Sequence, residues 1–424
     1  MKNFSAIVLL FIANTISGIA QGISMLAIPW YFAENGMMPQ FVKGYLLTNF
    51  LILFWAPYCG TLIDKYNRKK LFLVLNAVVG IIILSIAALG WMRGELEWYW
   101  VVSVFTLTFI TYNLHYPNLY AFVQEISEEK YYGSITSYIE IQGQLSSMLA
   151  GAGATVLLTG VSAEGLDIMG FTIHLPFDIA PWKIQEIFLL DGATYLVSFL
   201  VIMLIRFVPL KERAPQTLGL RAQFKIGIEY LRDNPALLVF GIASYLVFVT
   251  ILMEGFFLGA AYVKDHLQAD GSIYAFSEIF YAVGAIFTGF TIRFVFKKTS
   301  MPRGILILTA MTSVVYFALF ASKHIALLFV ALFFIGIANA GVRILRTTFL
   351  FQKVPNAVFG RAASIFALSN ITFRIILLSI FLLPIFHEEN NIIYAFLVLS
   401  IFLAIAVVVL WKNYPKIMNM DSTS

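Results

Sequence analysis

The sequence predicts an all-helical membrane protein with twelve transmembrane helices in two pseudo-symmetric six-helix bundles. Three observations lead to this prediction. Of the 424 residues, 60% are hydrophobic and only 12% are charged, whereas soluble domains carry about 25% charged residues. Apolar runs of about 20 residues, the length that spans a bilayer, recur from Phe4 almost to the C-terminus. Similar motifs also appear at matching places in the two halves of the chain.

The apolar runs place the twelve helices in chain order. We expect the first six at residues 4–33, 41–62, 71–92, 97–123, 133–159 and 185–208, and the second six at 236–263, 270–295, 300–321, 324–351, 355–384 and 390–412. The first run is too long for the apolar core of a signal peptide, so we interpret it as a membrane helix. Residues 1–208 then form the N-terminal bundle, 209–235 a cytoplasmic linker, and 236–424 the C-terminal bundle with a short cytoplasmic tail.

The distribution of Lys and Arg predicts the orientation of the chain. With the N-terminus inside, most basic residues fall in the inner loops and tails, and the outer loops hold only Lys43, Arg93, Lys183, Lys264 and Lys323. This bias is the positive-inside rule. It accounts for the formal net charge of +5 without a nucleic-acid partner. We therefore expect an integral protein of the inner or plasma membrane with both termini in the cytoplasm.

The linker contains an amphipathic pattern in LGLRAQFKIGIEYLRDNP. Its apolar and basic residues each recur at helical spacing: Leu220, Phe224, Ile228 and Leu231, beside Arg221, Lys225 and Arg232. Such a pattern is typical of a helix that lies on the inner membrane surface.

Internal repeats support the division into halves. Gln124 precedes Gly133 in FVQEISEEKYYGSITS, and Gln352 precedes Gly360 in LFQKVPNAVFGRAAS. Nine residues before these glutamines stand His115 and Arg343, and the pattern Gly60, Asp64, Arg68 is matched by Gly289, Arg293, Lys297. Repeated halves around a central site are a common transporter design.

The stretch GTLIDKYNRKK, from Gly60 to Lys70, places an aspartate and a basic cluster at the inner end of the second helix. A positive-inside loop explains the basic residues alone. A second interpretation also uses Gly60 and Asp64. Helix eleven begins on the same side with Gly360 and Arg361, and the N-terminus of a helix attracts a carboxylate. The alternative hypothesis is a latch between the halves, formed by Gly60, Asp64, Arg68, Gly360 and Arg361.

The loop GTLIDKYNRKK resembles that between helices two and three of the major facilitator superfamily. Within this family, DKYNRKK, VQEISEEKYYGSITSYIE, LLDGATYLVSFLV and FQKVPNAVFGRAASIF resemble the branch of macrolide-efflux proteins and the enterobactin exporter. The resemblance covers nearly the whole chain and implies export of a hydrophobic or amphipathic compound driven by the proton gradient. One departure is the absence of a glycine-proline motif in helix five, which reads SSMLAGAGATVLL. One alternative is export of a lipid-like or siderophore-like compound without proton exchange. Another is a membrane receptor or assembly module that does not transport.

Ionisable residues inside the predicted spans are functional candidates, because a charge near the bilayer centre costs at least about 2.5–3.5 kcal/mol. The proton-coupling candidates are Glu254, Glu140, Glu278 and Asp191. Glu254 is the first choice, and an ion pair with Arg374 is its alternative interpretation. Glu278 and Asp191 lie nearer the outer interface, where a structural or gating role is favoured.

Several polar residues are candidates for the substrate cavity. Arg343 and Arg346 share a helix face, suited to an anionic substrate or to a carboxylate such as Glu140. His115 either titrates near neutrality or packs by hydrogen bonding. The first helix carries a polar stripe that is expected to face a central cavity: Asn14, Ser17, Gln21 and Ser24. Its expected companions on other helices are Asn113, Asn370 and Arg374.

The motifs that are missing narrow the function further. The sequence has no GxxxxGK[ST] phosphate loop for ATP and no HExxH metal motif. Cys59 is the only cysteine, so neither a disulfide within the chain nor a cysteine-held cluster is possible. We expect a secondary transporter rather than an enzyme, with no cofactor or metal, whose partners are a small-molecule substrate, protons and the lipid bilayer.

Overall fold

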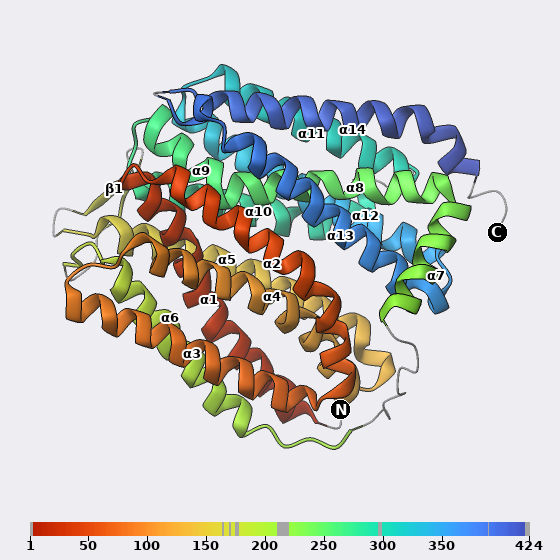
Figure 1. Cartoon of the computed structure of the whole chain (residues 1–424), viewed down its shortest axis with the longest axis horizontal. Coiled ribbons are helices and arrows are strands. Elements are labelled where there is room, and N and C mark those ends of the chain that lie inside the picture. The colour runs from red at the N-terminus through yellow and green to blue at the C-terminus, as the bar shows by residue number, and fades with distance from the viewer. Residues whose placement is uncertain are drawn as a thin grey trace. The chain divides into compact units, whose positions relative to one another are not determined.

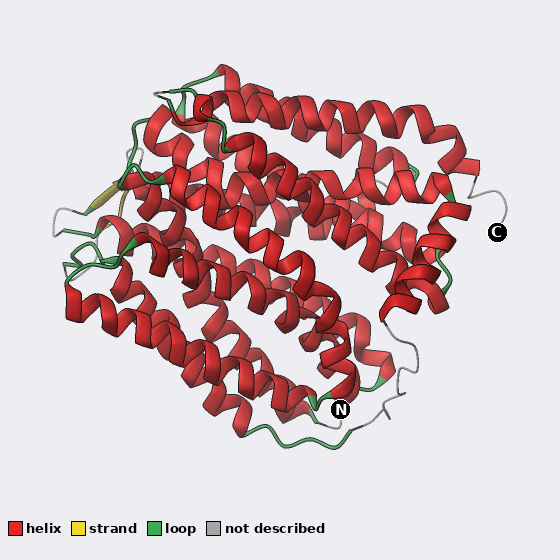
Figure 2. Cartoon of the chain, viewed as in Figure 1, coloured by secondary structure: helices red, strands yellow, loops and turns green. Residues whose placement is uncertain are grey.

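The computed structural model describes residues 3–162, 165–168, 171–173, 178–209, 220–295, 299–388 and 390–419. Four basic residues of the expected inner loops lie outside these ranges: Lys211, Arg213, Lys297 and Lys298. Arg293 lies within them, but its side chain is not described. Helices dominate the described residues (Figure 2). The described strands form one short antiparallel hairpin, β1 (Leu166–Ile168) and β2 (Phe171–Ile173), with Leu166 opposite Ile173.

The chain divides into two compact units, and each is described by itself. The first comprises Met1–Gln216 and Ala269–Ile279, and the second comprises Thr217–Gln268 and Phe280–Ser424. The first unit holds six long helices (Figure 1): α1 (Phe4–Glu34), α2 (Met38–Lys65), α3 (Arg68–Arg93), α4 (Trp98–Ile126), α5 (Tyr132–Thr159) and α6 (Ile184–Met203). A single 3₁₀ turn, η1 (Glu129–Tyr131), precedes α5.

The second unit begins with the linker helix α7 (Leu220–Asp233). A long helix follows, in which α8 (Pro235–Met253) and α9 (Gly259–Ala261) alternate with two π-helical turns, η2 (Glu254–Leu258) and η3 (Tyr262–His266). The remaining elements are α10 (Gly271–Val295), α11 (Met301–Ala321), α12 (Ile325–Lys353), α13 (Asn356–Phe381), η4 (Pro384–His387) and α14 (Ile393–Asn419). The first residues of α10 cluster with the first unit and the rest with the second.

These elements confirm the predicted helical membrane fold. Within the described residues, 10 helices are long and apolar enough to cross a membrane. The helices α4 and α5 have 29 and 28 residues, a sufficient length, but carry more polar side chains. With them the count reaches the twelve predicted spans. The largest differences are the end of α14, which reaches Asn419 and not residue 412, and the end of α6, which stops at Met203 and not at residue 208 as predicted.

Close packing of α3 against α6 fixes the geometry of the first unit. A Cβ atom added at Gly192 would lie 2.8 Å from Cγ of Leu84, and one added at Gly80 would lie 3.0 Å from Cβ of Tyr195. Glycine at these positions therefore allows the two backbones to approach. This contact sets the positions of the neighbouring α6 residues Asp191 and Tyr195, which belong to the candidate site.

The linker helix α7 packs against the second unit. A Cβ atom added at Gly227 would lie 3.0 Å from the carbonyl oxygen of Arg361, and the Tyr230 hydroxyl donates to the Lys353 carbonyl oxygen at 3.4 Å. Leu231 is 1% exposed, whereas Ile228 of the same apolar pattern is 52% exposed. One side of the amphipathic pattern thus contacts protein, and a membrane contact of the exposed side stays a prediction.

Candidate functional site

The loop between α2 and α3 is held by hydrogen bonds within the first unit. Asn67 caps α3, where its side chain accepts a bond of 3.0 Å from the Lys70 backbone. The Lys69 ammonium donates to the carbonyl oxygens of Met203 and Ile205 at 3.0 and 2.7 Å. These carbonyls stand at the C-terminal end of α6, where a cation satisfies unpaired acceptors. Lys69 of the basic cluster therefore caps the C-terminal end of α6.

Arg68 makes the best-defined ion pair in this region. Its Nη1 lies 3.2 Å from Oε2 of Glu125 and donates to the Ala121 carbonyl oxygen at 2.8 Å. The Arg68 side chain is 17% exposed and the Glu125 side chain 4%. Sequence reasoning assigned Arg68 to the latch and missed Glu125, although its place beside Gln124 in the repeated motif was a usable signal. Within this unit, Arg68 ties α3 to α4.

The glycines of the proposed latch have no close neighbour in the part of the chain that the structure describes. A Cβ atom added at Gly60 or Gly360 would meet no atom within 4 Å. Asp64 and Arg361 are half-buried. A latch between the units stays a prediction.

The polar stripe of α1 bonds to other helices of the first unit. The Asn14 amide donates to Oε1 of Gln142 on α5 at 2.7 Å, and its Oδ1 lies 2.8 Å from Nε2 of His115 on α4. The Gln21 amide donates to the Tyr195 hydroxyl on α6, and the Ser198 hydroxyl donates to the Ala13 carbonyl oxygen at 2.9 Å. The stripe thus has partners inside its own bundle, and its orientation toward a central cavity stays a prediction.

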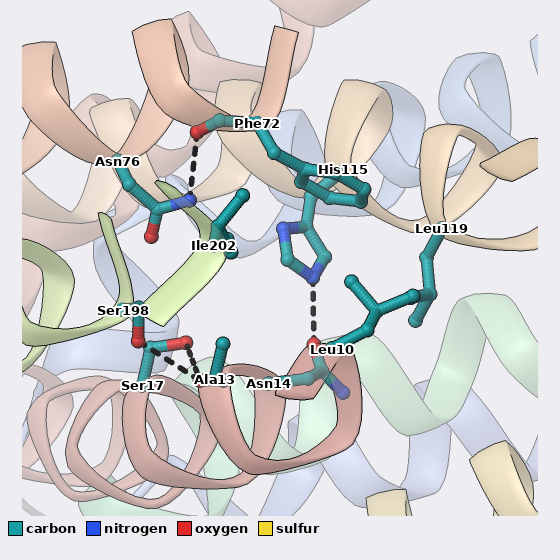
Figure 3. A pocket seen from close by; sticks show the side chains of 10 residues that line it. All are labelled: Leu10, Ala13, Asn14, Ser17, Phe72, Asn76, His115, Leu119, Ser198 and Ile202. Atoms are coloured by element: carbon teal, nitrogen blue, oxygen red, sulfur yellow. Dashed lines mark hydrogen bonds between the residues drawn. The ribbon is translucent and has the colours of Figure 1, made fainter. Parts of the chain in front are cut away.

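A small cavity of about 10 Å³ lies beside this stripe, between α1, α3, α4 and α6. Figure 3 shows Asn14, Ser17, Asn76 and Ser198 around it, with the dashed bond from His115 to Asn14. Because Asn14 Oδ1 is an acceptor, Nε2 of the neutral His115 ring carries the hydrogen and Nδ1 is left as an acceptor. This volume holds about one water molecule. The hydrogen-bonded packing role of His115 is thus the one that the structure displays.

Asp191 is the most unusual carboxylate of the first unit. Its residue is 0% exposed, and neither carboxylate oxygen has a hydrogen-bond partner among the described residues. The Ser24 hydroxyl of α1 lies beside the carboxylate and interacts with it as a hydrogen-bond donor, although the two groups do not form a bond of full hydrogen-bond geometry. Tyr195 and Tyr112 are close enough to interact electrostatically with it. The fold thus encloses an acidic group with no described cation.

The other acidic candidates have partners or more exposure. Glu140 accepts a hydrogen bond of 2.8 Å from the Tyr120 hydroxyl, so its described contact lies within the first unit. Glu278 is half-buried in the first part of α10. Glu254 is 2% exposed, opens the π-helical turn η2 and lies near Tyr316. Turns of the π type are frequent at functional sites, so Glu254 stays a candidate.

The second unit buries two arginines of the predicted cavity set. Arg346 and Arg374 are each 6% exposed, and the Nε atom of Arg346 has no hydrogen-bond partner among the described residues. Arg343 precedes Arg346 by one turn and is exposed. Asn370 is 5% exposed with an amide nitrogen that has no described partner, while the Asn113 amide donates to the Phe109 carbonyl oxygen of its own helix at 2.8 Å.

Each unit consists of membrane-length helices that bury ionisable side chains, a feature typical of membrane transport proteins. The chain belongs to the Major Facilitator Superfamily, which its sequence matches over residues 10–377. Comparison with curated protein sequences finds no match.

Solved structures of three transporters share the fold. The nucleoside transporter NupG is 14% identical, with a TM-score of 0.70 over 96% of this chain and 99% of that chain. The D-xylose-proton symporter is 13% identical, with a TM-score of 0.70 over 96% of this chain and 97% of that one. A bacterial homologue of the iron transporter ferroportin, in the inward-facing state, is 12% identical with a TM-score of 0.71, covering 97% of this chain and 99% of that one.

Proposed function

We propose that this chain is a proton-coupled secondary transporter that exports a hydrophobic or amphipathic small molecule by alternating access. The observation that carries the proposal is Asp191, a fully enclosed carboxylate without a described partner. The direction of transport and the substrate class come from the resemblance of four sequence motifs to those of macrolide-efflux proteins and the enterobactin exporter. The shared fold of a D-xylose-proton symporter is compatible with coupling to protons.

The coupling argument follows from the cost of burying charge. An ionised carboxylate enclosed in protein needs a cation or several hydrogen bonds, and otherwise it is favoured in its neutral, proton-bearing form. Among the described residues Asp191 has no cation beside it, and the Ser24 hydroxyl approaches it without full hydrogen-bond geometry. When access alternates and water reaches this position, hydration stabilises the ionised form and the proton leaves. Such a cycle links proton release to the conformational change.

Asp191 therefore takes the first place among the proton-site candidates, ahead of Glu254. The polar contacts between α1 and α6 favour a defined position for Asp191. Tyr195 lies one helical turn after Asp191 on α6, and its hydroxyl accepts a hydrogen bond from the Gln21 amide of α1. Glu254 remains the second candidate because it is buried at the start of a π-helical turn. The two acids sit in different units, so single substitutions separate their roles.

The test uses purified protein in proteoliposomes with a pH-sensitive dye inside. Erythromycin, uridine and D-xylose are each added with and without an imposed proton gradient. We expect the proton gradient to drive flux of erythromycin, the amphipathic compound. We expect Asp191→Asn to abolish this driven flux and to leave intact the exchange of erythromycin measured without a proton gradient. The control is Glu97→Gln, because Glu97 is 54% exposed. Gradient-driven flux of wild-type size in Asp191→Asn would refute the proposal.

A further inference from the structure

Arg346 of α12 is a buried cation with an incomplete set of partners. Its residue is 6% exposed. The guanidinium carbon lies 3.5 Å from the centre of the Tyr245 ring, and Nη1 donates to the Ser244 carbonyl oxygen at 3.1 Å. Its Nε has no hydrogen-bond partner among the described residues. None of the ion pairs found in the described part of the chain involves Arg346.

The contrast with Arg68 shows what is missing. Arg68 is more exposed, at 17%, and still has the Glu125 carboxylate at 3.2 Å. Arg346 is more deeply buried, and its described contacts are the Tyr245 side chain, through its ring face and a hydrogen-bond interaction, and the Ser244 carbonyl oxygen. A buried charge without a counter-charge is costly to the fold. Arg343 lies one helical turn earlier on α12 and is also a cation, so it does not compensate the charge of Arg346.

The geometry points to a site for the anionic group of the transported substrate, and we infer that Arg346 binds a carboxylate of an amphipathic organic anion. The inference rests on the proposed transport function and names its substrate class. A guanidinium offers its donors in a planar fork that matches a carboxylate in a two-bond arrangement. Here Tyr245 covers one face of the plane and the Ser244 carbonyl oxygen accepts from Nη1. The enclosed Nε is the donor that lacks a described acceptor, and a ligand carboxylate that reaches it on a change of access would supply one.

Packing around Tyr245 holds this arrangement in place. The Tyr245 ring stacks on Phe366 of α13, with centroids 6.1 Å apart and planes 28° apart. Phe366 packs against Gly241 of α8, where an added Cβ atom would clash with the ring. The Ser244 hydroxyl donates to the Gly241 carbonyl oxygen at 2.9 Å. Elements α8 and α13 together therefore fix the surface on which the guanidinium lies.

The depth of Arg346 favours a transported anion over a lipid headgroup. Arg346 stands seven residues before the end of α12, and Tyr245 stands ten residues after the start of α8. At a rise of 1.5 Å per residue these positions lie about 10 and 15 Å from the helix ends. The 29 residues of α12 span about 43 Å and the hydrocarbon core is about 30 Å thick. A helix centred in the bilayer therefore places Arg346 a few ångströms inside the edge of the core, below the level of the headgroups.

The binding test uses three naphthalene probes of one shape and different charge: 1-naphthoate, 1-naphthamide and 1-naphthylmethylammonium. Each is measured by equilibrium dialysis against the full chain in phosphatidylcholine nanodiscs, with empty nanodiscs subtracted. We expect naphthoate to bind at least about tenfold more tightly than naphthamide, which corresponds to one charge-assisted contact. We expect Arg346→Gln to remove this preference and Arg303→Gln, an exposed arginine of α11, to keep it.

Several outcomes would overturn the inference. Equal binding of naphthoate and naphthamide to wild-type protein is one, and an unchanged preference in Arg346→Gln is another. Loss of the preference when phosphatidylglycerol replaces phosphatidylcholine would assign the site to lipid headgroups instead. Because dialysis needs no proton gradient, a failure of proton coupling at Asp191 leaves these results unchanged, and the two proposals are tested separately.

A second measurement needs no ligand. If Arg346 is kept for an external anion, the apolar substitution Arg346→Met relieves an uncompensated charge, and the melting temperature of the ligand-free protein stays level or rises. If Arg346 is instead a structural residue, the melting temperature falls, as it should in Arg68→Met, where Glu125 loses its partner. A fall in Arg346→Met as large as that in Arg68→Met would overturn the inference.

Discussion

The ion pair between Arg68 and Glu125 gives the most direct test of how this protein stabilises its first unit. The perturbation is Glu125→Gln, which keeps the shape of the side chain and removes its charge. Glu125 is 4% exposed and lies 3.2 Å from Nη1 of Arg68. Removing one partner of a buried pair costs about 3–5 kcal/mol. Since Arg68 is 17% exposed and keeps its bond to the Ala121 carbonyl oxygen, we expect the lower end, about 3 kcal/mol.

The assay is equilibrium unfolding in mixed micelles, followed by tryptophan fluorescence, with a double-mutant cycle that adds Arg68→Gln. The matched control is Glu97→Gln, because Glu97 pairs with Arg93 at 3.6 Å and both side chains are 54% exposed. An exposed pair contributes about 0–1 kcal/mol. The reasoning is refuted if Glu125→Gln costs no more than Glu97→Gln, or if the cycle gives a coupling energy below about 0.5 kcal/mol.

Two further predictions concern the packing and the polar contacts of the same unit. Gly192→Val should lower the free energy of unfolding by about 1–3 kcal/mol, because the new Cβ atom would lie 3.0 Å from the Leu84 backbone nitrogen. Gly143→Val is the control, since no atom lies within 4 Å of a Cβ atom added there. A smaller cost for Gly192→Val than for the control would contradict the prediction. Asn14→Ala removes the bonds to Gln142 and His115 and should cost about 1–3 kcal/mol. Unfolding free energies check both, and the Asn14 effect should shrink when His115 is replaced first.

The boundaries of the helices followed closely from hydrophobicity, except that α14 continues to Asn419 beyond the predicted residue 412 and α6 ends early. The apolar run around Val201 to Val208 suggested that α6 continues to residue 208, but the helix ends at Met203. The Lys69 ammonium donates hydrogen bonds to the carbonyl oxygens of Met203 and Ile205. The Asn3 side chain accepts a hydrogen bond from the Val208 amide and donates one to the Val208 carbonyl oxygen. Side chains distant in the sequence thus replace the helical bonds of this segment.

The ranking of the candidate site residues depended on contacts that a sequence pattern does not contain. Glu254 and Asp191 look alike in sequence, since each is an acid in an apolar run. The structure distinguishes Asp191 because no described group compensates its carboxylate. In the same way Arg68 and Arg346 differ only through their neighbours, Glu125 for the first and Tyr245 for the second.

The sequence by itself determined the membrane fold, the approximate spans and the short set of ionisable residues inside them. It could do so because the bilayer selects apolar runs of fixed length and makes each intramembrane charge rare and costly. Only the tertiary structure decided which of these charges is compensated. The compensating partners come from other helices, as Glu125 does for Arg68 across 57 residues, and such pairings arise when the helices pack.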